Sequence, residues 1–170
     1  MNILIVVDMQ KDFIDGALGT KEAVAITDNV AKVIENFDGQ VIFTRDTHTE
    51  DYLNTQEGRK LPVVHCVKGT PGWELDEKLK PYVSEKTIVF DKPSFGSMEL
   101  AKYVSELENV ETITLVGLCT DICVISNAMI LKAAMPEAEL RVIENACAGV
   151  TPESHANALA AMKMCQIDII

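Results

Sequence analysis

The sequence predicts an α/β fold: a three-layer, doubly wound sandwich with a mostly parallel sheet of about six strands and helices on both faces. Short aliphatic runs alternate along the chain with segments whose apolar residues recur at helical spacing. Residues 3–7 are all aliphatic, as expected of a strand that is buried on both faces. The length of 170 residues suits a single domain that spans residues 1–170.

The expected elements follow from these patterns. Residues 21–37 have helical spacing, and Asp38 and Gly39 close that helix. Residues 121–134 are apolar on nearly every face, so this helix is expected to lie deep in the protein. The remaining strands are expected at residues 41–43, 87–90, 112–116, 139–143 and 167–170, and the remaining helices at residues 98–107 and 152–164.

A long polar segment interrupts this alternation. Residues 45–82 are rich in glycine and proline and show no sustained periodicity. A loop region of this length inside a compact domain usually has a function.

Composition and charge exclude several classes of function. Fifteen basic against twenty-six acidic residues give a net charge of -11, which argues against nucleic acid or an anionic membrane as partner. The first ten residues have neither a basic n-region nor a cleavage site, and their apolar run is too short to cross a bilayer. We therefore expect a cytoplasmic protein. Its cysteines are odd in number and form no CxxC pair, so free thiols are expected at positions 66, 119, 123, 147 and 165.

Reactive side chains follow the predicted strands at their carboxyl ends. Asp8 follows the first strand, Asp46 and His48 the second, Lys92 the third, and Cys123 the fourth. In an open parallel sheet, ligands bind beyond these strand ends, near the point where the strand order reverses. We therefore expect these side chains to share one cleft.

A carboxylate, an ammonium and a thiol in one cleft fit acyl transfer by a cysteine. Asp8 could accept the thiol proton, and Lys92 could stabilise the ionised pair and lower the thiol pKa. If Thr120 caps the helix that carries Cys123, the helix dipole would also favour a thiolate. The alternative is that Cys123 is a small buried hydrophobe. His155 is a poor candidate base because it lies in the last predicted helix, away from the strand ends.

A second group of residues suggests a metal site. Asp46 and His48 lie two apart on an extended segment and point the same way, and mixed nitrogen and oxygen ligands suit zinc, manganese or iron. Glu57 and His65 follow downstream, although Glu50 or Asp51 could take the place of Glu57. A carboxylate near a histidine is also common by chance among twenty-six acidic residues.

Several motifs together resemble one known family. They are D-M-Q-x-D-F-x-x-G at residues 8–16, T-R-D-T-H at 44–48, H-C-V-x-G-T-P-G at 65–72, Lys92, G-x-x-T-D-x-C-V at 117–124, and N-A-C-A at 145–148. In this order they resemble the isochorismatase-like cysteine hydrolases, and among these most closely the nicotinamidases. The resemblance covers almost the whole chain.

The resemblance implies roles for the reactive residues. Asp8 would be the general base, Lys92 the charge stabiliser, and Cys123 the nucleophile that attacks an amide and leaves a thioester. The family also has a cis peptide at the position of Leu118 and Cys119, where the N–H groups of Cys119 and Cys123 form an oxyanion hole.

The resemblance also implies a metal and a substrate-binding set. The metal ligands would be Asp46, His48, Glu57 and His65. The metal would be zinc as the first choice, with manganese or iron as alternatives, and it would hold the pyridine nitrogen of the substrate. The family's aromatic wall, three positions before the second metal histidine, is Pro62 here. The residues expected to contact the substrate are Phe13, Gln10, Phe95 and Trp73.

The expected function is therefore hydrolysis of nicotinamide to nicotinate and ammonia. The alternatives are a hydrolase of another small amide, such as a carbamoyl or ureido compound, and a catalytically silent small-molecule-binding domain. Isochorismatase activity is disfavoured because that branch does not use the cysteine as nucleophile. A small-molecule amide and further copies of the chain in a homo-oligomer are the expected partners.

Overall fold

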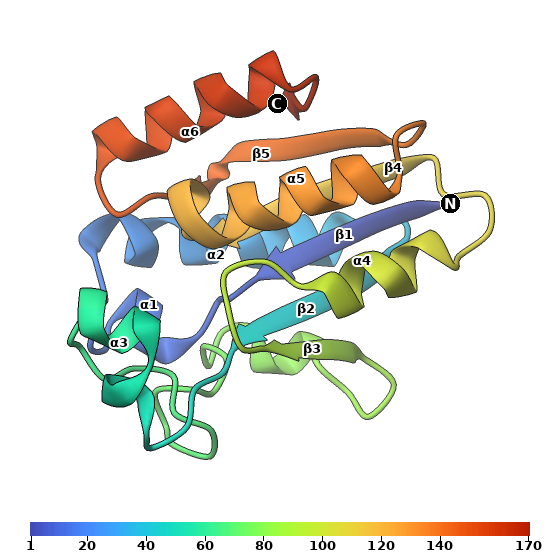
Figure 1. The fold of residues 1–170 in the computed structure, drawn as a ribbon. Helices are drawn as coiled ribbons and strands as arrows, with labels where there is room; N and C mark the ends of the chain where they lie inside the picture. The colour runs from blue at the N-terminus through green and yellow to red at the C-terminus, as the bar shows by residue number, and fades with distance from the viewer.

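A six-stranded sheet forms the centre of the computed structural model, which describes all 170 residues (Figure 1). Every strand pair is parallel, and the order is β3-β2-β1-β4-β5-β6. The predicted α/β fold and its six strands are confirmed. Their bounds are β1 Asn2–Val7, β2 Gln40–Asp46, β3 Ile88–Lys92, β4 Thr112–Leu118, β5 Glu139–Ala148 and β6 Asp168–Ile169.

Helices cover both faces of the sheet because β1 is apolar on both sides. Leu4 and Val6 pack in one cluster with α2, whereas Ile3, Ile5 and Val7 pack on the opposite face with α4, α5 and α6. The helices are α1 Lys11–Ile14, α2 Lys21–Asn36, α3 Gln56–Lys60, α4 Met98–Ser105, α5 Ile125–Ala134 and α6 Pro152–Met164.

The helix after β4 differs from its prediction. It begins with a π-helical turn, η3 (Thr120–Val124), and the Thr120 hydroxyl hydrogen-bonds with Nδ1 of His155 at 2.8 Å and makes no cap. Of α5 itself only Asn127, Ala128 and Leu131 are buried. The expectation that this helix lies deep holds for that side only, because α5 belongs to an outer layer: the rest of the helix is half-buried and Ala133 is exposed.

The predicted loop region is confirmed, with short helical turns inside it. It contains η1 (Tyr52–Asn54), α3 and η2 (Lys80–Tyr82), and its α3 lies beyond the carboxyl ends of the strands, near α1 (Figure 1). The strand order reverses between β1 and β4. This reversal places the carboxyl ends of these two strands side by side, where such folds bind ligands.

Gly117 permits the close contact between β4 and β1. Its φ is +114°, and a Cβ at this position would lie 2.1 Å from the carbonyl oxygen of Val7. We expect Gly117→Ala to destabilise the protein by about 3 kcal/mol, because neither backbone has room to move. The matched control is Gly69→Ala, with φ +82° but nothing within 4 Å, which should cost only about 1 kcal/mol. Denaturant unfolding measures both, and equal losses would contradict the steric argument.

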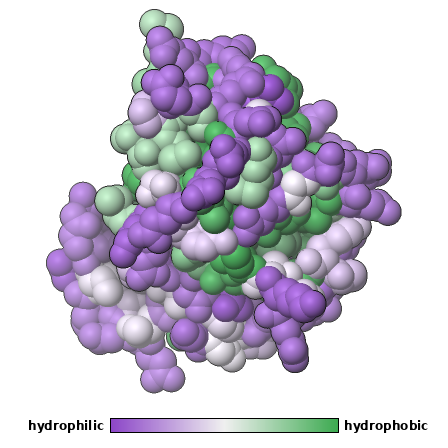
Figure 2. Space-filling view, turned by 90° about the vertical axis from the view of Figure 1, so that its right-hand side faces the viewer, coloured by the Kyte–Doolittle hydropathy of each residue, from purple (hydrophilic) through white to green (hydrophobic).

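Hydrophilic side chains cover most of the face shown in Figure 2, and apolar side chains form smaller areas between them. Among the helices, none has both the length and the apolar character needed to span a membrane.

Candidate active site

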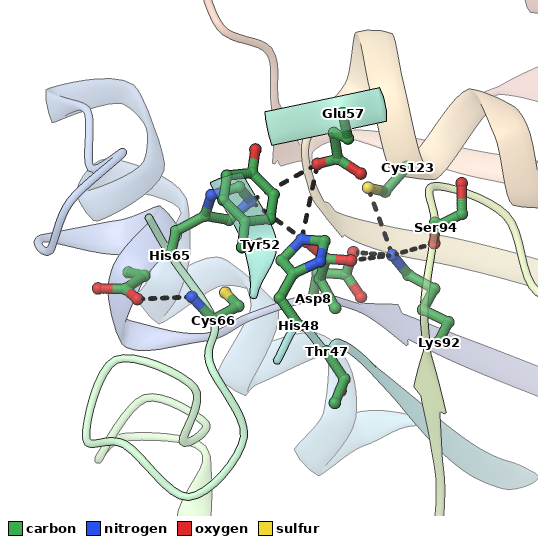
Figure 3. A network of polar contacts seen from close by, with 12 residues as sticks. Asp8, Thr47, His48, Tyr52, Glu57, His65, Cys66, Lys92, Ser94 and Cys123 are labelled. Atoms are coloured by element: carbon green, nitrogen blue, oxygen red, sulfur yellow. Dashed lines mark hydrogen bonds and ion pairs between the residues drawn. The ribbon is translucent and has the colours of Figure 1, made fainter. Parts of the chain in front are cut away.

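Three side chains from separate elements meet at the carboxyl edge of the sheet. Asp8 follows β1, Lys92 is the last residue of β3, and Cys123 lies in η3. The Lys92 Nζ lies 2.6 Å from Asp8 Oδ2 and 3.5 Å from Cys123 Sγ (Figure 3). All three are buried. The structure thus brings together the carboxylate, ammonium and thiol that the sequence predicts to share a cleft.

Two further groups hold this triad in place, and sequence analysis gave neither of them a role. The Thr44 hydroxyl donates a hydrogen bond to Asp8 Oδ1 at 2.6 Å, and the Ser94 carbonyl accepts one from Lys92 at 3.1 Å. Asp8 itself has φ +48°, a left-handed conformation that aspartate tolerates better than most residues. Because Thr44 binds Oδ1, the other carboxylate oxygen of Asp8, Oδ2, faces Lys92.

The expected lowering of the thiol pKa is wrong. Burial raises the pKa of Cys123 well above its ordinary value, and the Asp8 carboxylate raises it further, while Lys92 only partly opposes them. Burial also raises the pKa of Asp8, although Lys92 lowers it. The pKa of Lys92 is raised, because the attraction of the Asp8 and Asp46 carboxylates outweighs its burial. The site therefore holds a neutral thiol next to a carboxylate made more basic by burial.

Four potential metal ligands form a second cluster beside the triad. The ligand atoms of Asp46, His48, Glu57 and His65 all lie within 4.8 Å of one another. Asp46 Oδ2 is 3.0 Å from His48 Nε2 and 3.4 Å from His65 Nε2, and Glu57 Oε1 is 3.6 Å from His48 Nε2. Glu57, and neither Glu50 nor Asp51, completes the group.

The charges of this cluster fit a divalent cation. Asp46 Oδ1 is buried without a hydrogen-bond partner, 3.6 Å from Lys92 Nζ. Burial, together with the charge of Asp46, raises the pKa of Glu57. Asp8 and Asp46 thus share the single Lys92 ammonium, and Glu57 adds a third carboxylate beside the two histidines. Two carboxylates and two imidazoles form a donor set suited to zinc, manganese or iron.

Tyr52 supports the two histidines and was missed by sequence reasoning. Its ring lies 4.6 Å from the ring centre of His48 and 5.0 Å from that of His65. Burial raises the pKa of Tyr52 to about 12, and its hydroxyl donates to the Leu61 carbonyl at 2.9 Å. The Tyr52 side chain therefore holds in place both His48 and His65 and the segment that follows α3.

Gln10 and Trp73 do not line the cavity at this site, contrary to expectation. The Gln10 amide is buried and spans the backbone of Asp46, accepting from its N–H at 2.7 Å and donating to its carbonyl at 2.9 Å. The Trp73 indole donates to the Thr47 hydroxyl at 2.9 Å, and the Arg45 guanidinium stacks 3.7 Å above the ring. Both residues position the segment that carries Asp46.

A mostly apolar cavity of about 210 Å³ connects the triad with the ligand cluster. Phe13 and Phe95 line it as expected. Pro62 does not, and its neighbour Leu61 forms part of the wall in place of an aromatic ring. The other lining residues are Leu18, Thr20, Asp46, Glu57, His65, Cys119, Ile122, Cys123 and Val150.

The peptide between Leu118 and Cys119 is cis, as the resemblance implied. The Cys119 N–H donates no hydrogen bond within the protein. Burial raises the pKa of the Cys119 thiol to about 12. Cys119 therefore presents a free backbone donor next to the cavity, together with a neutral side chain.

Comparison with known proteins agrees with this geometry. The family model described as the isochorismatase domain matches residues 2–170. A nicotinamidase/pyrazinamidase of Mycobacterium tuberculosis is 28% identical, over 100% of this chain and 98% of the relative. A pyrazinamidase of Pyrococcus horikoshii in complex with zinc has a TM-score of 0.83 and 30% identity, covering 99% of this chain and 98% of that one. A pyrazinamidase/nicotinamidase of Streptococcus mutans has a TM-score of 0.85 and 28% identity, covering 100% of both chains. The chain belongs to the isochorismatase family.

Proposed function

We propose that this protein is an amidohydrolase that converts nicotinamide to nicotinate and ammonia. The observation that carries the proposal is a small apolar cavity lined on one side by Cys123, with the Lys92–Asp8 pair directly behind it, and on the other by Asp46, Glu57 and His65 of the metal-binding cluster. The nicotinamidase and pyrazinamidase relatives support the same activity. A cavity of about 210 Å³ suits an amide with a single ring.

The reaction would begin with proton transfer from the Cys123 thiol to Asp8 as the sulfur attacks the amide carbon. Because the thiol pKa is raised, the proton leaves only as the new bond forms, and the basic carboxylate of Asp8 is placed to receive it. The carbonyl oxygen gains negative charge, which the N–H groups of Cys119 and Cys123 would stabilise. Lys92 holds the carboxylate in position.

Ammonia would then leave with the proton carried by Asp8, and a thioester would remain on Cys123. A water molecule attacks the thioester carbon and gives a proton to Asp8, which returns it to the sulfur as nicotinate departs. The same carboxylate therefore serves as base and acid in both halves of the reaction.

Asp46, His48, Glu57 and His65 would hold a divalent ion, with zinc as the first candidate. When bound there, the ion supplies an electron-pair acceptor for the ring nitrogen of the substrate. Phe13 and Phe95 would pack against the faces of the ring.

The aliphatic wall at Leu61 supports a second candidate substrate. A carbamoyl or ureido compound without an aromatic ring needs no aromatic wall there. We also propose that the protein acts in the cytoplasm as a homo-oligomer. The five free cysteines support the cytoplasmic location, and the exposed apolar side chains of Met98 and Met164 support the homo-oligomer.

Ammonia release from nicotinamide tests the proposal. We expect turnover that is lost after chelation and restored by added zinc or manganese, because the ring would lose its anchor without the ion. Full activity in chelated protein shown by elemental analysis to be metal-free would contradict the role of the ligand cluster. Turnover of a ureido compound with none on nicotinamide would favour the second candidate, and no turnover of any amide would favour a binding domain.

A further inference from the structure

Asn127 is a buried side chain of α5 whose hydrogen bonds all go to segments around the cavity. It is 1% exposed and lies one helical turn after Cys123. Its Nδ2 donates to the carbonyl oxygens of Cys123 at 2.8 Å and Phe95 at 3.1 Å, and its Oδ1 accepts from the N–H of Ser97 at 3.0 Å. One amide thus joins the nucleophile to the segment that carries Phe95.

Apart from the bonds of Asn127, that segment, residues 93–97, is fixed by the hydrogen bond from Lys92 to the Ser94 carbonyl at 3.1 Å. No backbone–backbone hydrogen bond outside the helices and strands involves residues 93–96. Gly96 approaches α5 closely, since a Cβ there would lie 2.5 Å from Ile130 Cδ1. Phe95 lines the cavity with 40% of its surface still exposed. Lys92 holds the residue before Phe95, but the hydrogen bond to Phe95 itself comes from Asn127, so the position of this aromatic wall depends on Asn127.

We propose that Asn127 is a positioning residue that sets the Phe95 ring against the Cys123 thiol and so makes the site select acyl groups that carry a ring. A buried amide is costly unless its groups are paired, and three of its four hydrogen-bonding positions are used here, all on the two walls it joins. The inference rests on the proposed function, because it assumes that Cys123 attacks compounds bound in this cavity.

The test compares two thiol reagents, because their reaction with Cys123 needs no amide hydrolysis. Chloroacetamide and N-phenylchloroacetamide both form a carbon–sulfur bond with Cys123 and release chloride while Asp8 takes the thiol proton, but only the second carries a ring. Peptide mass spectrometry gives the labelling rate at Cys123. The unaltered protein should prefer the ring-bearing reagent, and Asn127→Ala should lower that preference about fivefold, the loss expected when one aromatic contact is misplaced.

Phe95→Ala should lower the preference by a similar factor, and the double variant should fall no further, because both changes remove the same contact. Ala128→Gly is the matched control: it weakens α5 by about 1 kcal/mol but keeps every bond of Asn127, so the preference should stay within about twofold. If Asn127→Ala does not fold, Asn127→Asp keeps the acceptor for Ser97 and loses both donated bonds, and it should show the same loss.

An unchanged preference in a folded Asn127 variant overturns the proposal, as does an equal loss in Ala128→Gly. An unaltered protein that shows no preference, or no labelling of Cys123, overturns it as well. Ammonia release from nicotinamide is measured separately. A protein that releases no ammonia but loses its ring preference in the Asn127 variants would therefore refute the proposed function and support the role of Asn127.

Discussion

Cys123→Ala should lower the rate of ammonia release from nicotinamide by at least about 10⁴-fold, because it removes the sulfur that forms the proposed thioester. The sulfur lies 3.5 Å from the Lys92 ammonium, on the cavity wall. Alanine removes this sulfur, and the small change in volume leaves the fold in place. Time courses of ammonia release, with the variant's unfolding transition measured alongside, give the comparison.

Cys119→Ala is the matched control for that experiment. Cys119 lines the same cavity, but its thiol has a pKa raised to about 12, and its proposed contribution comes from the backbone N–H. We expect the rate to stay within about threefold of the parent, since alanine has the same N–H. Loss of activity in Cys119→Ala with retention in Cys123→Ala would mean that Cys119, and not Cys123, is the nucleophile.

Most of the fold could be predicted because its signals are local. The aliphatic run at residues 3–7 indicates a strand buried on both faces, and the alternation of strands with helices leads to a parallel sheet. The helix after β4 was placed correctly, but its burial was predicted only in part. Its apolar residues gave no indication of which side faces the sheet, because that depends on how α4 and α6 pack beside it.

The reactive residues of the site were also predictable, since they follow the ends of strands. The residues that support them were not. Thr44 is an inward-facing strand residue, and Asn127 an amide inside an apolar helix, and neither belongs to a pattern that reveals its partners. Gln10 was expected at the substrate, but only the structure shows its amide on the backbone of Asp46. The direction of the Cys123 pKa shift likewise depends on burial, which a sequence motif does not report.

Asp8→Asn should lower kcat by about 10³-fold, since the proposed reaction passes every proton through this carboxylate. Asparagine has the same shape and tolerates the φ of +48° at this position, so the backbone should be retained. The amide accepts no proton from the thiol. The pH profile of kcat/KM tests the role of the carboxylate directly. The activity of the parent should fall as the pH drops through the raised pKa of Asp8, and this acid limb of the profile should be absent in Asp8→Asn.

Thr44→Ala serves as the control that separates the charge of Asp8 from its position. Burial raises the pKa of Asp8, and the charge of Lys92 lowers it. The charge of Asp46 raises this pKa as well, whereas the hydrogen bond from the Thr44 hydroxyl lowers it. Removing the hydroxyl leaves the carboxylate in place but raises its pKa further. The active form is the carboxylate, so the acid limb of Thr44→Ala should shift to higher pH while the plateau rate falls much less than in Asp8→Asn. A limb that shifts to lower pH, or that persists in Asp8→Asn, would mean that another group is the base.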